Sequence, residues 1–269
     1  ATYTSGSGST SLVFQYTIQA GETDDNGISI GADVLALNSG TIRDRPGHNA
    51  TLTHSAVSAN TSYKVDTTAP TVNSFTISDS LLTIGETATV DLVFSEAVFG
   101  FASAADITDP SGTLAAMTSS DNINWTGTFT PTANTEEAIN TLSLATSWTD
   151  LAGNGGPSQT TANYEVDTKS PTGSFTFTDY HFKLGDNATV TLDFSEVVVG
   201  FSSDADITVP NLDNGTTSGT LTAMTSSDNI TWTGTFTPTF PNTQDWSNTL
   251  SLATNYTDTV GNTGTVATS

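Results

Sequence analysis

The 269-residue chain has no cysteine, only five lysine and arginine residues, and no apolar run near the eighteen or so residues that cross a membrane. Without cysteine, it has neither disulfides nor thiolate metal ligands or thiol nucleophiles. Its 28 acidic residues leave a formal net charge of −23, which excludes the basic surface that nucleic-acid binding requires. The first residues lack the basic and apolar regions of a signal peptide. We therefore expect a soluble segment of a longer polypeptide that binds no nucleic acid and does not insert into a membrane.

Charged residues are also scarce, at 12% of the chain, whereas 35% of the residues are hydrophobic. Most of the polar surface must therefore come from threonine, serine, asparagine and glycine. Threonine favours β-strands with an exposed hydroxyl face, and asparagine and glycine favour turns. The sequence shows no long Leu/Ala/Glu/Lys periodicity of the helical kind, so it predicts an all-β protein.

Two long segments repeat each other at a spacing of about a hundred residues. The matched segments are 65–70 with 166–171, 89–96 with 189–196, 105–108 with 205–208, 125–131 with 232–238 and 140–146 with 248–254. Because the pairs follow the same order, we expect two complete domains, at residues 67–167 and 168–269. A third domain, at residues 1–66, carries only the later part of the pattern.

Within each repeat, apolar residues alternate with polar ones, a period typical of half-buried strands. In the first complete repeat we expect strands near 71–78, 86–95, 122–130, 139–146 and 158–166, with two more between 98 and 118. About seven strands separated by turn signals predict a tandem of immunoglobulin-like β-sandwiches, the first one incomplete. The same alternation points Trp125 and Trp232 toward the core rather than toward a sugar-stacking surface.

Residues 1–66 are expected to supply only the C-terminal strands of a sandwich. Residues 11–18 and 33–37 fit its fifth and sixth strands, 44–49 the following loop, and 63–65 the end of the last strand. Half a sandwich leaves an inner face and strand edges uncovered. We therefore expect an upstream segment or another chain to complete this domain.

Three motifs carry a resemblance to a known family. They are the linker Val-Asp-Thr-Thr-Ala-Pro at 65–70, the strand end Phe94-Ser95-Glu96, and the Asp-x-x-Gly-Asn loop from Asp150 to Asn154. Together they resemble the tandem bacterial Ig-like (extender) domains of large, calcium-dependent RTX-type surface adhesins. Residues 1–66 resemble the second half of a related calcium-associated bacterial surface repeat. Two features depart from the pattern: the loop after Asp44 reads Arg-Pro-Gly-His-Asn, and Gly-Gly-x-Gly-x-Asp repeats are absent.

The resemblance implies a secreted spacer at the bacterial cell surface. It also implies that calcium loads the spacer and that its partners are the neighbouring repeats of the same adhesin.

Acidic residues that are distant in sequence should meet at one end of each sandwich. In a seven-stranded sandwich, the end of the second strand, the loop between the last two strands and the incoming linker share that end. The first predicted group is Asp66, Glu96, Asp150 and Asn154, and the second is Asp167, Glu196, Asp258 and Asn262. Oxygen ligands without nitrogen or sulfur indicate a hard cation. Calcium accepts six to eight of them in flexible geometry, whereas magnesium demands a tighter octahedron, so we predict calcium.

The facing end of the preceding domain is acidic too. Asp24 and Asp25 should face Asp66, while Glu136 and Glu137 should face Asp167. Mutual repulsion of these carboxylates should splay the junction unless a cation neutralises them. Calcium at the junctions would then stiffen the chain into a rod.

Each of these residues also has a purely structural interpretation. The linker aspartates can cap turns, the strand-end glutamates can be solvated, and the loop aspartates can form Asx turns. Asp106 and Asp206, each beside an isoleucine, can extend the metal site or stabilise a turn. The segment 24–27 resembles the start of a calcium loop but lacks the spacing of an EF-hand. Asp121-Asn122 and Asp228-Asn229 fit hairpin turns.

Enzymatic motifs are missing: the histidines do not recur between repeats, and neither His-Glu-x-x-His nor Gly-x-Ser-x-Gly occurs. We therefore expect a non-enzymatic spacer that projects a distal binding module from the cell. The alternative is an adhesion module that binds a carbohydrate or a protein through residues 98–118, or through the insertion at 211–219 that only the last repeat has. A third interpretation is an accessory domain of a carbohydrate-active enzyme.

Overall fold

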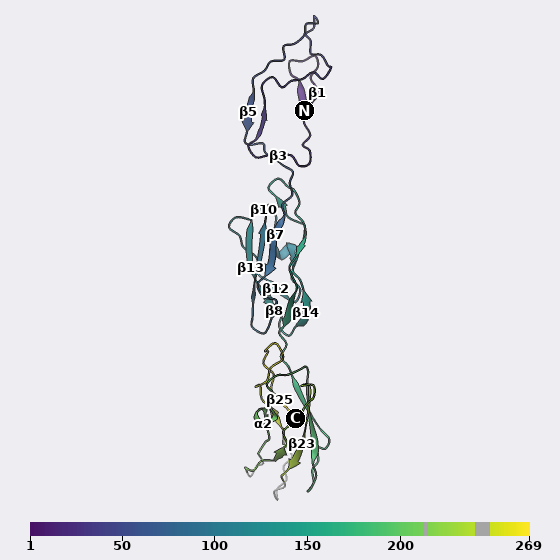
Figure 1. Cartoon of the computed structure of the whole chain (residues 1–269), viewed down its shortest axis with the longest axis vertical. Coiled ribbons are helices and arrows are strands. Elements are labelled where there is room, and N and C mark those ends of the chain that lie inside the picture. The colour runs from purple at the N-terminus through teal and green to yellow at the C-terminus, as the bar shows by residue number, and fades with distance from the viewer. Residues whose placement is uncertain (212–214, 240–247) are drawn as a thin grey trace.

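The computed structural model describes residues 1–211, 215–239 and 248–269. It shows three strand-rich units placed end to end along the long axis of the molecule (Figure 1). The described residues contain only two helices, α1 (Ser103–Asp106) and α2 (Ser203–Asp206), of four residues each. Neither is long and apolar enough to span a membrane. The prediction of an all-β chain of tandem immunoglobulin-like sandwiches is confirmed.

The middle unit is a complete sandwich. Its strands are β7 (Val72–Ile77), β8 (Leu81–Leu82), β9 (Ala88–Phe94), β10 (Val98–Phe99), β11 (Ile107–Thr108), β12 (Gly112–Leu114), β13 (Asn124–Pro131), β14 (Glu136–Asn140), β15 (Ser143–Leu144), β16 (Thr149–Asp150), β17 (Gln159–Thr160) and β18 (Tyr164–Asp167). One sheet has the order β12-β13-β9-β7, and the other strands form the shorter ladders β11-β15-β17, β14-β18-β8 and β10-β16. Leu92 of the first sheet and Leu144 and Val166 of the ladders belong to one buried cluster, so the core lies between the two layers.

The alternation of apolar residues accounts for this core. Along β9, the buried residues Val90, Leu92 and Phe94 alternate with more exposed ones. Trp125 lies opposite Leu92 in the adjacent strand and packs partly buried against the cluster, as the sequence predicts. The predicted strands at 71–78, 86–95 and 122–130 correspond to β7, β9 and β13.

Between residues 98 and 118 the structure differs from the expected pair of strands. This segment holds the short strands β10, β11 and β12 and the single turn α1. The turn forms because the Asp106 carboxylate accepts the Ala102 N–H at 2.7 Å, while the Ser103 hydroxyl accepts the Met117 N–H at 2.9 Å. Local side-chain bonds to the backbone therefore replace part of a strand ladder.

The third unit repeats this architecture. Its described strands are β19 (Gly173–Phe177), β20 (Ala188–Phe194), β21 (Ile207–Thr208), β22 (Gly219–Leu221), β23 (Thr231–Pro238), β24 (Ser251–Leu252) and β25 (Ala267–Thr268). The sheet order β19-β20-β23-β22 matches that of the middle unit. Leu192 lies opposite Trp232 as Leu92 lies opposite Trp125, so the register is the same.

The first unit has no comparable core. Its strands are β1 (Thr2–Ser5), β2 (Val13–Gln15), β3 (Thr23–Asp24), β4 (Ile28–Ile30), β5 (Val57–Asn60) and β6 (Val65–Asp66), which pair only two by two. The strand predicted at 33–37 is wrong. Asp33 has a positive φ of 56°, and its carboxylate accepts the His54 N–H at 2.7 Å, so the chain turns there instead.

A pair of aromatic rings packs in each complete unit. The ring centroids of Phe94 and Trp148 are 4.5 Å apart, and those of Phe194 and Tyr256 are 4.8 Å apart. A Cβ atom added at Gly156 would lie 2.1 Å from the Trp148 ring, and one added at Gly264 would lie 2.2 Å from the Tyr256 ring. Glycine is required at both positions because the backbone crosses the face of a buried ring.

We predict that Gly156→Ala destabilises the middle unit by about 1–3 kcal/mol, because Trp148 must leave its position. The matched control is Gly155→Ala, since a Cβ at Gly155 meets nothing within 4 Å. Chemical denaturation followed by tryptophan fluorescence measures both. Equal stability of the two variants would contradict the packing argument.

Candidate metal centres

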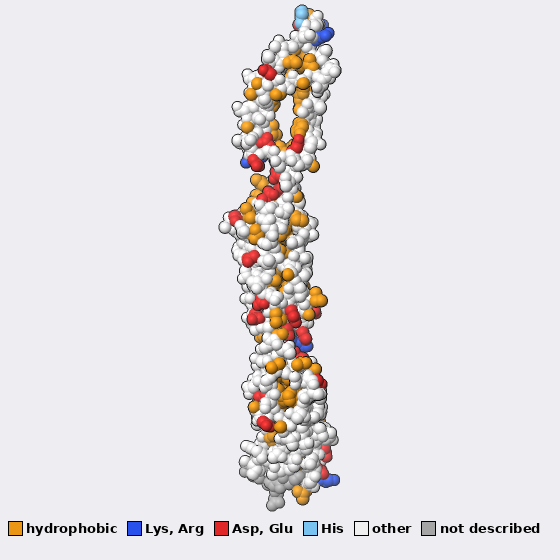
Figure 2. Space-filling view, in the orientation of Figure 1, with side chains coloured by type: hydrophobic (Ala, Val, Ile, Leu, Met, Phe, Trp, Pro, Cys, Tyr) orange, Lys and Arg blue, Asp and Glu red, His pale blue; other side chains and the backbone are white. Residues whose placement is uncertain are grey.

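The structure brings two groups of three carboxylates together. Asp66, Glu96 and Asp150 form the first group, and Asp167, Glu196 and Asp258 form the second. In each group, one carboxylate oxygen per residue lies within 4.8 Å of the others. These are the six carboxylates that the sandwich topology predicts at the junctions, and acidic side chains gather at both junctions in Figure 2.

Each group draws its members from three segments. Asp66 ends β6 of the preceding unit, Glu96 follows β9, and Asp150 ends β16. Asp150 opens a tight loop in which Gly153 has a positive φ of 94°. The second group has the same origin, with Asp167 at the end of β18 and Gly261 at a φ of 101° in the loop that Asp258 opens. We name residues 150–154 and 258–262 the aspartate loops.

The asparagine that closes each aspartate loop holds the carboxylates in place. In the first group, Asn154 Nδ2 donates to Asp150 Oδ2 at 2.7 Å and to the Asp66 carbonyl oxygen at 3.1 Å. In the second, Asn262 Nδ2 donates to Asp258 Oδ2 at 2.7 Å and to the Asp167 carbonyl oxygen at 2.9 Å. We expected both asparagines among the ligands. Because their amide nitrogens face the carboxylates, the structure gives them a positioning role instead.

Asn262 also joins two units directly. Its Oδ1 accepts the backbone N–H of Ile84 at 2.9 Å, and Ile84 lies in the turn between β8 and β9 of the middle unit. One amide group thus links the preceding unit, the linker and the aspartate loop of the third unit.

Burial and like charge act together on these carboxylates. Burial raises the pKa of Glu96, and the charges of Asp66 and Asp150 raise it further. The pKa of Glu196 is raised in the same way, first by burial and then by Asp258 and Asp167. The Oε1 atom of Glu196 is buried with no hydrogen-bond partner. A carboxylate oxygen in this state lacks the positive partner that its charge requires.

The pKa values of the aspartates shift in different directions, depending on the hydrogen bonds that each carboxylate accepts. Burial raises the pKa of Asp167, the charge of Asp258 adds to that effect, and the N–H of Lys169 opposes it. For Asp150, burial acts to raise the pKa, but the hydrogen bonds donated by the side chain and backbone of Asn154 and by neighbouring N–H groups outweigh it and leave the pKa lowered. These hydrogen bonds therefore favour the ionised form of Asp150.

The other predicted acidic residues lie outside both groups. Asp106 accepts the Ala102 N–H and the Ser147 hydroxyl, and Asp206 accepts the Ser202 N–H at 2.7 Å, so each stabilises the turn of a short helix rather than extending a metal site. Asp24 accepts the N–H of Gly27 at 2.8 Å in an Asx-type turn.

The remaining three residues are exposed or lie beside a group. Asp25 and Glu137 are exposed. Glu136 lies beside the second group, where its charge helps to raise the pKa of Glu196, and it accepts from Lys169 Nζ at 3.1 Å. Both partners of this ion pair are about half exposed, so it adds little stability.

One recurring contact was not predicted from the sequence, and it is made by the threonine after each linker aspartate. Thr67 Oγ1 accepts the Gly21 N–H at 2.8 Å and donates to the Glu22 carbonyl oxygen at 3.0 Å. Thr168 Oγ1 accepts the Thr135 N–H at 3.0 Å and donates to the Thr132 carbonyl oxygen at 2.6 Å. Each linker is thus attached to a loop of the preceding unit. The repeated Asp-Thr pair is the signal that could have revealed it.

The two complete units match a known protein family. The sequence profile of the bacterial Ig-like domain matches residues 66–166 and 167–269, and both matches begin at a linker aspartate. The chain belongs to the bacterial Ig-like domain family. Ig-like domains of this kind are typically non-enzymatic structural modules, so this chain is a tandem of structural modules.

Two solved structures are similar to this bacterial Ig-like chain at low identity. One is FdeC, described as an Escherichia coli adhesin that elicits protection against urinary tract infections, with 14% identity, a TM-score of 0.34, and coverage of 77% of this chain and 65% of that one. The other is the N-terminal eight Ig domains of Down Syndrome Cell Adhesion Molecule isoform 1.30.30, with 11% identity, a TM-score of 0.33, and coverage of 96% and 41%. The chain therefore spans less than two thirds of either. Among curated proteins, none shows significant sequence similarity.

The raised pKa values predict how stability depends on pH in excess chelator. A carboxyl whose pKa is higher in the folded than in the unfolded protein favours folding below its ordinary value, 4.5 for a glutamate, and this contribution is lost as pH rises through the folded value. We predict that Glu196→Gln reduces the loss of stability of the third unit between about pH 4 and pH 7. Glu137→Gln, on an exposed strand, is the control and should leave the profile unchanged. Identical profiles for all three proteins would refute this.

We predict that Asn262→Ala destabilises the third unit by about 1–3 kcal/mol, because Asp167 and Asp258 lose a buried donor. It should also loosen the second junction, because the Ile84 N–H loses its acceptor. Denaturation measures the first effect, and small-angle scattering or residual dipolar couplings measure the second. Asn255→Ala, at an exposed position three residues before Asp258, is the matched control. A variant that loses stability but keeps the interdomain angle would show that the Ile84 contact does not fix the junction.

Proposed function

We propose that the chain is a spacer of a secreted bacterial surface adhesin, and that calcium bound at the interdomain junctions stiffens it. One observation carries this proposal: each family match opens with a linker aspartate that meets a strand-end glutamate and a buried loop aspartate within 4.8 Å. The arrangement occurs twice, at equivalent places.

The donor set fits calcium. Three carboxylates supply only oxygen, and calcium accepts six to eight oxygen ligands, so backbone carbonyls or water would complete its shell. The buried Oε1 of Glu196 has no hydrogen-bond partner, and a cation would satisfy it. A divalent charge would also relieve the mutual repulsion that raises the pKa values of Glu96 and Glu196.

The position of the ligands explains how an ion could stiffen the chain. Asp167 is the last residue of β18, a strand of the middle unit, whereas Glu196 and Asp258 belong to the third unit. A shared ion would attach the last strand of one unit to the end of the next. At the first junction, Asp66 and Glu96 would form the same bridge.

The adhesin role extends the structural role of the family. Units in a row make a long, thin molecule (Figure 1), a shape suited to holding a binding module away from a cell. A net charge of −23 disfavours non-specific contact with anionic surfaces and keeps the exposed rod in solution. We propose that its partners are neighbouring repeats of the same RTX-type adhesin, and that it acts outside the cell, in adhesion or biofilm formation.

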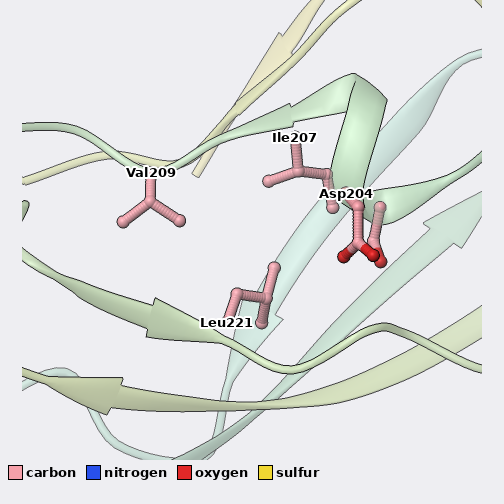
Figure 3. Close-up of a pocket in the computed structure, with 5 residues that line it drawn as sticks. Asp204, Ile207, Val209 and Leu221 are labelled. Carbon is pink, nitrogen blue, oxygen red and sulfur yellow. The ribbon is translucent and has the colours of Figure 1, made fainter.

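The alternative, a binding module, receives less support. A recess in the third unit is lined by Ser203, Asp204, Ile207, Val209 and Leu221, which lie outside residues 98–118 and on either side of the insertion at 211–219 in the sequence (Figure 3). None of the described residues that line it is aromatic, and aromatic rings are what usually stack on sugars. Of the insertion at 211–219, residues 212–214 lie outside the described part of the chain.

The test compares thermal stability and small-angle scattering in millimolar calcium, in magnesium and in excess chelator. We expect calcium to raise the melting temperature, because a ligand bound only by the folded state stabilises it, by about 2.7 kcal/mol at a hundred times its dissociation constant. The particle should also become longer and stiffer. Magnesium should do less, because it prefers to keep its water ligands.

Two variants assign the effect to single junctions. Asp167→Ala should abolish stiffening at the second junction only, and Asp66→Ala at the first only. Asp228→Ala, in an exposed hairpin turn, is the control and should respond to calcium as the unmodified chain does. Scattering profiles that superimpose with calcium and with chelator would sink the proposal.

A further inference from the structure

The first unit contains an aspartate loop like those of the two complete units. Asp44 donates its N–H to the His48 carbonyl oxygen at 3.0 Å, as Asp150 does to Asn154 at 3.1 Å. The His48 N–H donates to Asp44 Oδ1 at 2.7 Å, and His48 Nδ1 lies 2.9 Å from Asp44 Oδ2, where the other loops place an asparagine amide. The bridge between Arg43 and Asn49 matches that between Thr149 and Gly155. Residues 1–66 are therefore the later part of the same structural unit.

Comparison with the middle unit shows which strands the first unit lacks. β12 pairs with β13, and β1 pairs with β2 in the same way; but β13 also pairs with β9, while β2 has no second neighbour. β14 pairs with β18 in the register Glu136 with Asp167, and β3 pairs with β6 in the register Thr23 with Asp66. β18 has β8 on its other side, while β6, in a fully described unit, has none. The first unit has no equivalent of the elements that precede β12, and among these β7, β8 and β9 are the ones that would extend its two open ladders.

The face that those strands would cover is apolar. Twelve large apolar side chains between Tyr3 and Tyr63 are 38% to 64% exposed. Neither buried cluster includes any residue of this unit. Figure 2 shows the unit hollowed through its middle, with hydrophobic side chains around the opening. An uncovered face of this kind, bordered by open strand edges, is a surface for strand addition.

The first junction has an unfilled position that points to the same partner. Asn262 Oδ1 accepts the N–H of Ile84, in the turn before β9 of the preceding unit. Asn154 occupies the equivalent place, and its amide nitrogen makes the equivalent bonds to Asp66 and Asp150. None of the described residues donates to Asn154 Oδ1. The turn that would donate to it belongs to the segment that the first unit lacks.

We propose that residues 1–66 accept a β-hairpin of the kind formed by β7 to β9. Its second strand would pair with the free edge of β2, its apolar side chains would fill the opening, and its turn would donate an N–H to Asn154 Oδ1. The partner's chemistry follows from the residues that do this in the middle unit: alternating apolar side chains such as Val90, Leu92 and Phe94, with polar residues between them.

A second copy of this chain fits the surface less well. Its own β7 and β9 are already paired within their sheet, and the copies would bring together two chains with a net charge of −23 each. The occupant is therefore a separate hairpin segment rather than a duplicate of the whole chain.

The test adds a copy of residues 70–111 ahead of residue 1 of the full chain, so that β1 follows the copy as β12 follows residue 111. We expect the amides of β2 and β6 to exchange at least about 100-fold more slowly, because fraying edges become part of a cooperative unit. Binding of an apolar dye should fall to the level of the isolated complete repeats. All measurements are made in excess chelator, so the result does not depend on calcium.

The control fusion carries serine in place of the copied Val90, Leu92 and Phe94, and it should leave exchange and dye binding as they are in the unmodified chain. Equal exchange in the two fusions would overturn the proposal. So would a dimer of the unmodified chain that protects β2 to the same degree, since the occupant would then be a second copy. The calcium proposal would survive either result.

Discussion

At both junctions, three carboxylates are held within a few ångströms of one another, and one of them is the last residue of a strand in the preceding unit. Charges of one sign at this distance repel strongly in a partly buried site. The fold must therefore hold them there against that repulsion, and the raised pKa values of Glu96, Glu196 and Asp167 record the cost. Either a proton or a cation can relieve this repulsion, but only a cation can bind carboxylates of two units at once.

The core of each sandwich supplies the restraint. Phe94 lies two residues before Glu96, and Trp148 lies two residues before Asp150, so the contact between these two rings fixes the two segments that carry ligands. Phe194 and Tyr256 do the same for the second group. Two residues after each aspartate loop, a glycine lets the backbone pass against the face of the buried ring. Packing and electrostatics are thus coupled: the apolar core is stable enough to hold charges that would otherwise separate.

The first unit has an aspartate loop and a last strand like those of the middle unit, but it has no buried core. Its aspartate loop forms through local hydrogen bonds, with His48 in place of asparagine, although no buried aromatic ring lies beneath it. Its last strand pairs with β3 in the register of the middle unit and carries Asp66 to the first junction. Local hydrogen bonds therefore specify the loop and the linker even where the apolar side chains of the unit stay exposed.

Most strands of the two complete units could be predicted from the residues alone, because period-two alternation and turn signals act over a few positions. Each pattern also occurs twice in the chain. The six carboxylates of the two groups were predictable for the same reason, since strand order determines which segment ends meet. The roles of Asn154, Asn262 and Asp106 were not, because an amide or carboxylate can face either way, and only the surrounding donors decide which. The strand expected at 33–37 failed because one bond from His54 to Asp33 outweighed a short apolar pattern. The sequence determined which segments meet; the tertiary structure decided which atoms of each side chain face one another.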